Sequence, residues 1–167
     1  VDIINVVPSN LPLQIHLMVE NPEKIYEIFK SNLSIKHAKC EFIFHVENKE
    51  NTDLFKLISQ VKADGYRVGL AINPSTIVSE LDPYLKLIDT VLIMSVNPGF
   101  SGQKFISGVL SKIEYIKSIQ NDMKIGLDGG VNDQTVNSVN LKNIDFLVSG
   151  SYLFSSDKRS EAVLSLK

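Results

Sequence analysis

Short apolar runs alternate with amphipathic segments along the whole chain. Within each run the apolar residues are nearly continuous, which is typical of parallel strands covered on both faces. Between the runs, apolar residues recur every three or four positions, which is the spacing of a helix with one buried face. The pattern predicts six strands, at Leu13–Met18, Cys40–Val46, Arg67–Ile72, Thr90–Ser95, Lys124–Leu127 and Asp145–Val148.

The helical segments carry recognisable start and stop signals. Asn21 is a good N-cap and is followed by Pro22, which suits a first helical position. This first helix repeats Ile25, Ile28 and Phe29 at helical spacing, and Gly65 is placed to end the second helix. The remaining helices are predicted at Thr52–Ala63, Thr76–Leu85, Lys104–Gln120, Asn132–Val139 and Asp157–Leu166.

Strand and helix repeated in this way predict a parallel sheet with right-handed crossovers. An open doubly wound sheet and a barrel both fit the alternation, and the polar residues decide between them. They stand at the carboxyl ends of all the strands, as expected of a ring whose ends converge on one mouth. The polar or glycine residues at these strand ends are His16, His45 with Glu47, Asn73, Ser95 with Asn97, Asp128 and the pair Gly150-Ser151.

The predicted fold is therefore an incomplete (β/α)8 barrel in one domain over residues 1–167. About six of the eight βα units are present, because 167 residues are fewer than the ~200 to 250 of a full barrel. The strands at Leu13–Met18 and Asp145–Val148 are then open edges without protective charge or proline. Association through these edges, including a homo-oligomer, is expected.

Asp128 is the strongest candidate for chemistry on the residues alone. A carboxylate at the end of a buried strand needs a partner or a metal, and Gly129 and Gly130 let the backbone approach a ligand closely. His16 is a candidate ligand, although a histidine in a strand is more often an ordinary core residue. His45 is the weaker of the two candidates.

Three glycine-rich turns follow strands, at Asn97–Gln103, Asp128–Gly130 and Ser149–Ser151. Backbone N–H groups at such turns form anion sites, and barrels often bind phosphate after their last two strands. Each turn alone also reads as an ordinary connection. Three at one mouth indicate a phosphorylated ligand.

Composition narrows the choice of partners. A net charge of −2 gives no electrostatic reason to expect nucleic acid or an anionic membrane. No apolar run reaches the ~18 residues of a membrane helix, and no signal-peptide pattern is present. The single cysteine, Cys40, excludes an intrachain disulfide and reads as a small buried hydrophobe. A reducing, cytoplasmic location is expected.

Six segments together resemble the ribulose-phosphate 3-epimerase family, in the family's order and spacing: Leu11–Tyr26, Phe44–Glu47, Gly69–Thr76, Val91–Ile106, Leu127–Asn132 and Ser149–Phe154. The resemblance implies a barrel of the ribulose-phosphate binding type that interconverts D-ribulose 5-phosphate and D-xylulose 5-phosphate in the pentose phosphate pathway. It also implies two aspartates, on opposite faces of the substrate, that move the proton at C3. A divalent metal (zinc, iron, manganese or cobalt), held by two histidines and the same two aspartates, stabilises the ene-diolate.

Carried over by position, His16 is a metal ligand that also contacts the substrate. Asp128 is a metal ligand, a substrate contact and one of the two acid/bases. Met18 and Met94 line the site or belong to the core. Two departures are tolerable: Ser101 replaces a family glycine, and Gln14 replaces an acidic residue. The residues implied to contact substrate or phosphate are Gly99, Phe100, Ser101, Gly102, Gly129, Gly130, Gly150 and Ser151.

The large departure is at the start, where Val1–Leu11 resembles only the helix after the family's second strand. The unmatched strands hold two metal ligands and the second aspartate, so the chain alone is expected to be inactive and to bind metal weakly. Three hypotheses follow: part of an active epimerase whose first strands lie upstream, a catalytically dead relative that binds a phosphosugar or a partner, or an epimerase of another ketose phosphate such as allulose 6-phosphate.

Overall fold

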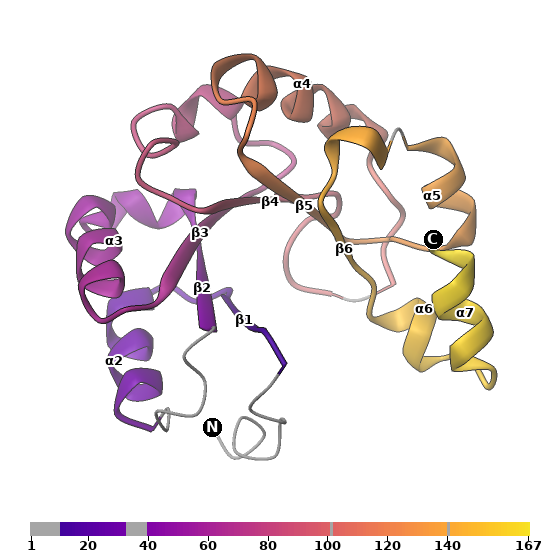
Figure 1. The fold of residues 1–167 in the computed structure, drawn as a ribbon, viewed down its shortest axis with the longest axis horizontal. Coiled ribbons are helices and arrows are strands. Elements are labelled where there is room, and N and C mark those ends of the chain that lie inside the picture. The colour runs from indigo at the N-terminus through magenta and orange to yellow at the C-terminus, as the bar shows by residue number, and fades with distance from the viewer. Residues whose placement is uncertain (1–10, 33–39, 101, 140) are drawn as a thin grey trace.

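Six parallel strands form a single sheet in the computed structural model, which describes residues 11–32, 40–100, 102–139 and 141–167 (Figure 1). Each strand is hydrogen-bonded to the one that follows it in sequence. All six predicted strands are confirmed to within two residues at either end. They are β1 (Leu13–Leu17), β2 (Cys40–His45), β3 (Arg67–Ile72), β4 (Thr90–Met94), β5 (Lys124–Asp128) and β6 (Phe146–Val148).

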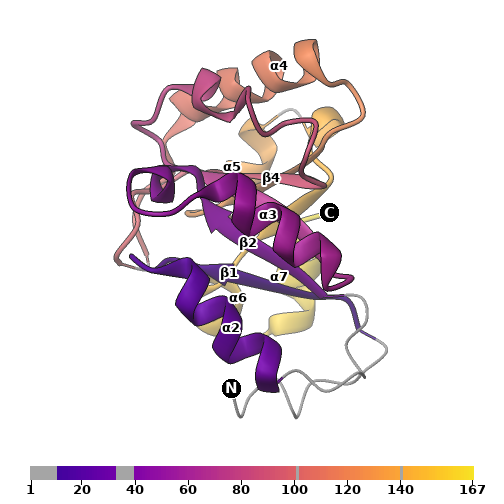
Figure 2. The same ribbon diagram turned by 90° about the vertical axis from the view of Figure 1, so that its left-hand side faces the viewer.

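The sheet is strongly curved, and the helices that connect its strands lie along the outside of the curve (Figure 1). Seen from the side, α2 and α3 lie next to each other over β1 and β2 (Figure 2). An open doubly wound sheet would carry helices on both faces. The incomplete barrel predicted from the sequence is therefore confirmed. Among the described residues, β1 and β6 each pair with one strand only, and association through these edges stays a prediction.

The α-helices are short, the longest described one having 11 residues. None of the described helices has the length and apolar character needed to cross a membrane. They are α2 (Pro22–Asn32), α3 (Leu54–Ala63), α4 (Leu110–Ile119), α5 (Asp133–Ser138), α6 (Ser151–Phe154) and α7 (Arg159–Ser165). Short 3₁₀ turns lie between them, at Val46–Glu50, Val78–Leu81, Ser107–Val109 and Leu141–Asn143.

Most predicted caps are present. Oδ1 of Asn21 accepts a hydrogen bond from the Lys24 N–H, 3.2 Å away, and Oδ1 of Asn132 accepts from the second and third residues of α5. Helix α3 is capped by Asp53, one residue later than the predicted start at Thr52. Gly65 follows the end of α3 with φ +86°, a conformation that glycine adopts without a steric penalty.

Two helix predictions are wrong. Residues 76–85 contain only the 3₁₀ turn Val78–Leu81, because Pro83 lacks an N–H and its ring clashes with the preceding helical turn. The helix predicted over Lys104–Gln120 begins at Leu110. The preceding residues do not join the helix, because Ile106 is extended and its N–H donates to the Ser95 carbonyl, 2.8 Å away.

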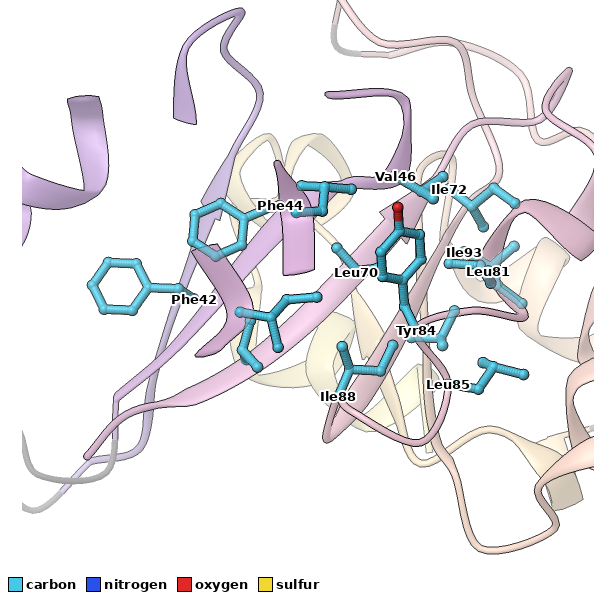
Figure 3. Close-up of a cluster of buried hydrophobic side chains, with 14 of the residues drawn as sticks. Phe42, Phe44, Val46, Leu70, Ile72, Leu81, Tyr84, Leu85, Ile88 and Ile93 are labelled. Carbon is cyan, nitrogen blue, oxygen red and sulfur yellow. The ribbon is translucent and has the colours of Figure 1, made fainter. Parts of the chain in front are cut away.

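The main core lies between the outer face of the sheet and the helices (Figure 3). Phe42 and Phe44 point outward from β2, and Tyr26 of α2 packs edge-on against Phe42 at a centroid distance of 4.9 Å. Tyr26 is fully buried, and burial of its hydroxyl is tolerated because this group donates a hydrogen bond to Asp64 Oδ2, 2.6 Å away. Ile28, which the helical pattern placed with the apolar residues of α2, is instead 42% exposed.

A second, smaller cluster fills the inner face of the curve. It consists of Ile43, Ala71, Leu92 and Met94, with Phe146 packed against them. The two clusters together explain why the strands are apolar without alternation, since both faces of each central strand are covered. Cys40 is buried at the start of β2, and burial raises the pKa of its thiol to about 12.

Gly69 of β3 gives a test of how tightly the curved sheet is packed. A Cβ at Gly69 would lie 2.9 Å from the Thr90 carbonyl oxygen on β4. Gly69→Ala should therefore lower the free energy of unfolding by about 1 to 3 kcal/mol. Gly108→Ala is the matched control, because a Cβ there meets nothing within 4 Å. Urea unfolding of both variants checks this, and equal stabilities would contradict it.

Candidate active site

His16 and Asp128 lie together at the mouth of the curve. His16 is near the end of β1 and Asp128 ends β5, yet the His16 Nδ1 and Asp128 Oδ2 atoms are only 3.6 Å apart. Both side chains are largely but not completely buried, at 15% and 19% exposure. The distance is too long for a hydrogen bond. The prediction that the two side chains face one mouth is confirmed, while their roles remain predictions.

His45, at the end of β2 and the weaker candidate on the sequence alone, is a direct neighbour of His16. Its Nε2 atom lies 2.9 Å from Nε2 of His16, and its Nδ1 atom lies 3.2 Å from Oε2 of Glu47. His45 is buried, with 6% exposure. The available signal was a second histidine at the end of the adjacent predicted strand, followed two residues later by a carboxylate.

Glu47 is held as a carboxylate by its hydrogen bonds. Burial by itself would raise the pKa of Glu47. Hydrogen bonds from His45, the Thr76 hydroxyl and the Asn73 N–H outweigh burial and hold this pKa at about 2. Lys112 of α4 supports the same turn, because its Nζ donates to the carbonyls of Asn73 and Thr76 at 2.6 and 2.7 Å. Desolvation lowers the pKa of Lys112, an effect that the Glu47 charge opposes.

A pocket of about 640 Å³ opens beside Asp128. Each predicted substrate-contacting residue on the three glycine turns lines it, apart from Ser101, which is outside the described residues. Half-exposed Met18 and buried Met94 also line it, whereas His16, predicted to contact the substrate, is not among the lining residues. The lining is Met18, Met94, Val96, Asn97, Pro98, Gly99, Phe100, Gly102, Gln103, Asp128, Gly129, Gly130, Val131, Val148, Gly150 and Ser151.

The Gly129-Gly130 pair is required by packing of the chain on itself. Both residues have positive φ, +115° and +63°. A Cβ at Gly129 would lie 2.5 Å from Val96, and one at Gly130 would lie 2.9 Å from the Phe105 backbone nitrogen. The loop after β4 therefore approaches this backbone closely, and ligand contact by Gly129 and Gly130, which both line the pocket, stays a prediction.

Ser95 and Gln103 fix that loop. The buried Ser95 hydroxyl lies within hydrogen-bonding distance of the carbonyls of Asp128 and Gly129, at 2.9 and 2.6 Å, and so ties the ends of β4 and β5 together. Nε2 of Gln103 donates to the carbonyls of Asn97 and Phe100, at 2.6 and 2.8 Å, closing the loop on itself. The polar residue Ser95 at the end of β4 is thus a structural clamp.

Gly150 differs from the other glycines of the site. A Cβ there would meet nothing within 4 Å, but its φ of −100° and ψ of −82° lie outside the favoured α region, a conformation that glycine adopts more readily than other residues. Packing gives no reason for a glycine at this position. The space beside Gly150 at the pocket wall is open.

The His16–Asp128 pair fits two ligands of one metal ion. Nitrogen and oxygen ligands ~2.0 to 2.2 Å from a tetrahedral ion are roughly 3.4 Å apart, close to the observed spacing. Within the part of the chain that the structure describes, no group of three or more histidine, cysteine, aspartate or glutamate side chains could hold a metal. The described residues therefore bring two side chains of metal-ligating types to ligand spacing, and their role as ligands stays a prediction.

Comparison with known proteins agrees with this geometry. Residues 1–154 match the model of the ribulose-phosphate 3 epimerase family. The chain is 34% identical over 165 residues to the ribulose-phosphate 3-epimerase of Bacillus subtilis and 36% identical over 164 residues to that of Helicobacter pylori. Both alignments cover 95% of this chain and 72% of the relative.

A likeness among solved structures supports the fold alone. The 3-hexulose-6-phosphate synthase of Salmonella typhimurium superposes with a TM-score of 0.56 over 93% of this chain and 96% of that protein. The sequence identity is 14%. The match is to a barrel-type protein, in agreement with the curved parallel sheet.

The Glu47 hydrogen bonds should make stability depend on acid pH. The pKa of Glu47 falls from 4.5 to about 2, so its contribution is complete above pH 4.5 and is lost as the pH falls toward 2. The contribution is roughly 2 to 3 kcal/mol. Urea unfolding at several pH values should show Glu47→Gln less stable than the parent above pH 4.5, with the gap closing below it. Glu50→Gln, an exposed neighbour, should show no gap that changes with pH, and a constant gap for Glu47→Gln would contradict the assignment.

Proposed function

Because the chain belongs to the ribulose-phosphate 3-epimerase family, we propose that it acts on the proton at C3 that distinguishes D-ribulose 5-phosphate from D-xylulose 5-phosphate. The observation that carries the proposal is the 3.6 Å approach of Asp128 to His16 beside a pocket lined by three glycine turns. This arrangement supports a role for Asp128 in proton transfer and for the backbone of the glycine turns in binding the phosphate.

Asp128 is the proposed proton-transferring group. The C3 proton lies next to the ketose carbonyl, and its removal needs a base in contact with the substrate. Inversion then needs a proton donor on the opposite face. Of the described residues that line the pocket, Asp128 is the only carboxylate. The described residues therefore provide for proton transfer on one face, and the 167-residue chain is proposed to lack full epimerase activity.

His16 and Asp128 are the residues that would hold a divalent metal, through Nδ1 and Oδ2. A bound metal supplies electrophilic stabilisation for the negative charge that develops on the substrate oxygens as C3 loses its proton. Zinc, iron, manganese and cobalt all accept this mixed nitrogen and oxygen donor set.

The phosphate is proposed to bind at the glycine turns. The backbone at Gly99, Gly102 and Gly150 borders the pocket without a side chain in the way. Exposed N–H groups of such turns bind phosphate oxygens. Ser151 stands next to Gly150 at the pocket wall and adds a hydroxyl donor.

A sugar-phosphate-binding protein without catalytic activity is the second candidate. It is favoured by the single carboxylate among the described residues of the pocket wall. The two candidates share the binding pocket and differ only in whether C3 loses its proton.

Gly150→Leu should weaken phosphate binding, with a smaller cost in stability because ψ at this position is −82°. The side chain would enter the open space beside the pocket. Affinity for ribulose 5-phosphate should fall by on the order of tenfold or more, the value of a lost charge-assisted hydrogen bond, while affinity for unphosphorylated ribulose should be unchanged. Calorimetric titration with both ligands checks this. Gly108→Leu, at another open glycine outside the pocket, is the control, and equal losses for both ligands would contradict the phosphate assignment.

Deuterium exchange separates the enzyme from the binder. In D₂O, with a divalent metal added, one carboxylate should exchange the C3 hydrogen of one epimer without inverting it, as followed by proton NMR. Asp128→Asn should abolish the exchange, and Asp122→Asn, a change at an exposed residue outside the pocket, should not.

No exchange in the parent protein would favour the binder. Inversion at a rate typical of enzymes would show a second catalytic group within the chain and refute the single-face proposal. Running the same assay with allulose 6-phosphate tests the alternative ketose substrate.

A further inference from the structure

Four side chains form a continuous line into the site. They run from Glu47 through His45 and His16 to Asp128, with successive separations of 3.2, 2.9 and 3.6 Å. The line starts after β2, crosses to β1 and ends at β5. Nothing in the proposed function uses its first two members.

The hydrogen bonds of Glu47 determine which nitrogen of His45 carries a hydrogen. Oε1 of Glu47 is occupied by the Asn73 N–H, 2.9 Å away, and by the Thr76 hydroxyl. Its Oε2 faces Nδ1 of His45. A carboxylate only accepts hydrogen bonds, so Nδ1 of His45 must carry the hydrogen. The low pKa of Glu47 keeps it in this accepting form.

The tautomer of His45 in turn determines the tautomer of His16. In a neutral imidazole that is protonated at Nδ1, Nε2 is an acceptor. Nε2 of His45 therefore accepts a hydrogen from Nε2 of His16, 2.9 Å away, and the two ring planes are only 16° apart. His16 is left with an unprotonated Nδ1, and this atom faces Asp128 at a distance longer than a hydrogen bond.

We propose that His45 and Glu47 are positioning residues that fix the tautomer of His16, so that its Nδ1 lone pair points toward Asp128. Two acceptors placed opposite each other are arranged to share one cation. The inference takes its purpose from the proposed function, but its test does not depend on activity. Second partners of metal-binding histidines commonly act in this way.

The surroundings keep the line rigid. The His45 N–H donates to Oδ1 of Asn48, 3.2 Å away, and Nδ2 of Asn48 donates to the Val19 carbonyl beyond β1, 2.9 Å away. Lys112 holds the turn that carries the Asn73 N–H. The histidine pair is therefore fixed from both strands that bear it.

Glu47→Gln should exchange the hydrogen positions on both His45 and His16. The Asn73 N–H requires an acceptor, so the glutamine places its oxygen there and its NH₂ group against His45. Nδ1 of His45 would then accept, Nε2 of His45 would donate, and His16 would carry its hydrogen on Nδ1. Glu50→Gln is the matched control, because Glu50 is exposed in the same 3₁₀ turn and is not a member of the line.

The test is nitrogen-15 NMR of the imidazole rings in the metal-free 167-residue protein at roughly pH 8, where histidines are neutral. The chain has three histidines, so single His→Gln variants assign the signals. The parent and Glu50→Gln should show hydrogen on Nε2 of His16 and on Nδ1 of His45. Glu47→Gln should show both positions exchanged.

Hydrogen on Nδ1 of His16 in the parent protein would overturn the proposal, whether or not the variant folds. Unchanged tautomers in folded Glu47→Gln would overturn it too. As a second readout, competition with a chromophoric chelator should show zinc affinity reduced about 10- to 100-fold in Glu47→Gln and unchanged in Glu50→Gln. Correct tautomers without C3 exchange would refute the enzymatic function and leave this inference standing.

Discussion

The curvature of the parallel sheet is the constraint on which the site depends. His16 and Asp128 come from β1 and β5, with three strands between them, and only a strong curve brings their side chains to 3.6 Å. The curve follows from the twist of parallel strands with helices packed on the outside. Small residues on the inner side of β3, Gly69 and Ala71, allow the neighbouring strands to close in.

The carboxyl ends of the strands carry a layer of polar groups that support one another. His45 and Glu47 lie behind His16, and the Asn73–Thr76 turn, held by Lys112, lies behind Glu47. Burying such groups is costly unless their hydrogen bonds are made. Here the hydrogen bonds also fix donor and acceptor roles, because the Glu47 carboxylate at one end determines which nitrogen of each histidine carries a hydrogen.

Glycines of one pocket serve two different needs. Gly129 and Gly130 are glycines because the loop after β4 packs against them and their φ angles are positive. Gly150 is not enclosed by packing and borders open space, and its ψ of −82° lies outside the favoured α region. Packing thus accounts for the glycines after β5, while the backbone conformation favours glycine at position 150.

The sequence by itself determined the strands, the parallel order, the barrel class and the pairing of His16 with Asp128 at one mouth. These depend on local apolar runs and on the rule that parallel strands end at the same edge. The structure decided the rest: Pro83 interrupts a predicted helix, the Tyr26 ring is buried through its bond to Asp64, and His45 links Glu47 to His16. The last two involve partners 38 and 29 residues apart. Such contacts are set by the curvature and register of the sheet, which no local pattern along the chain encodes.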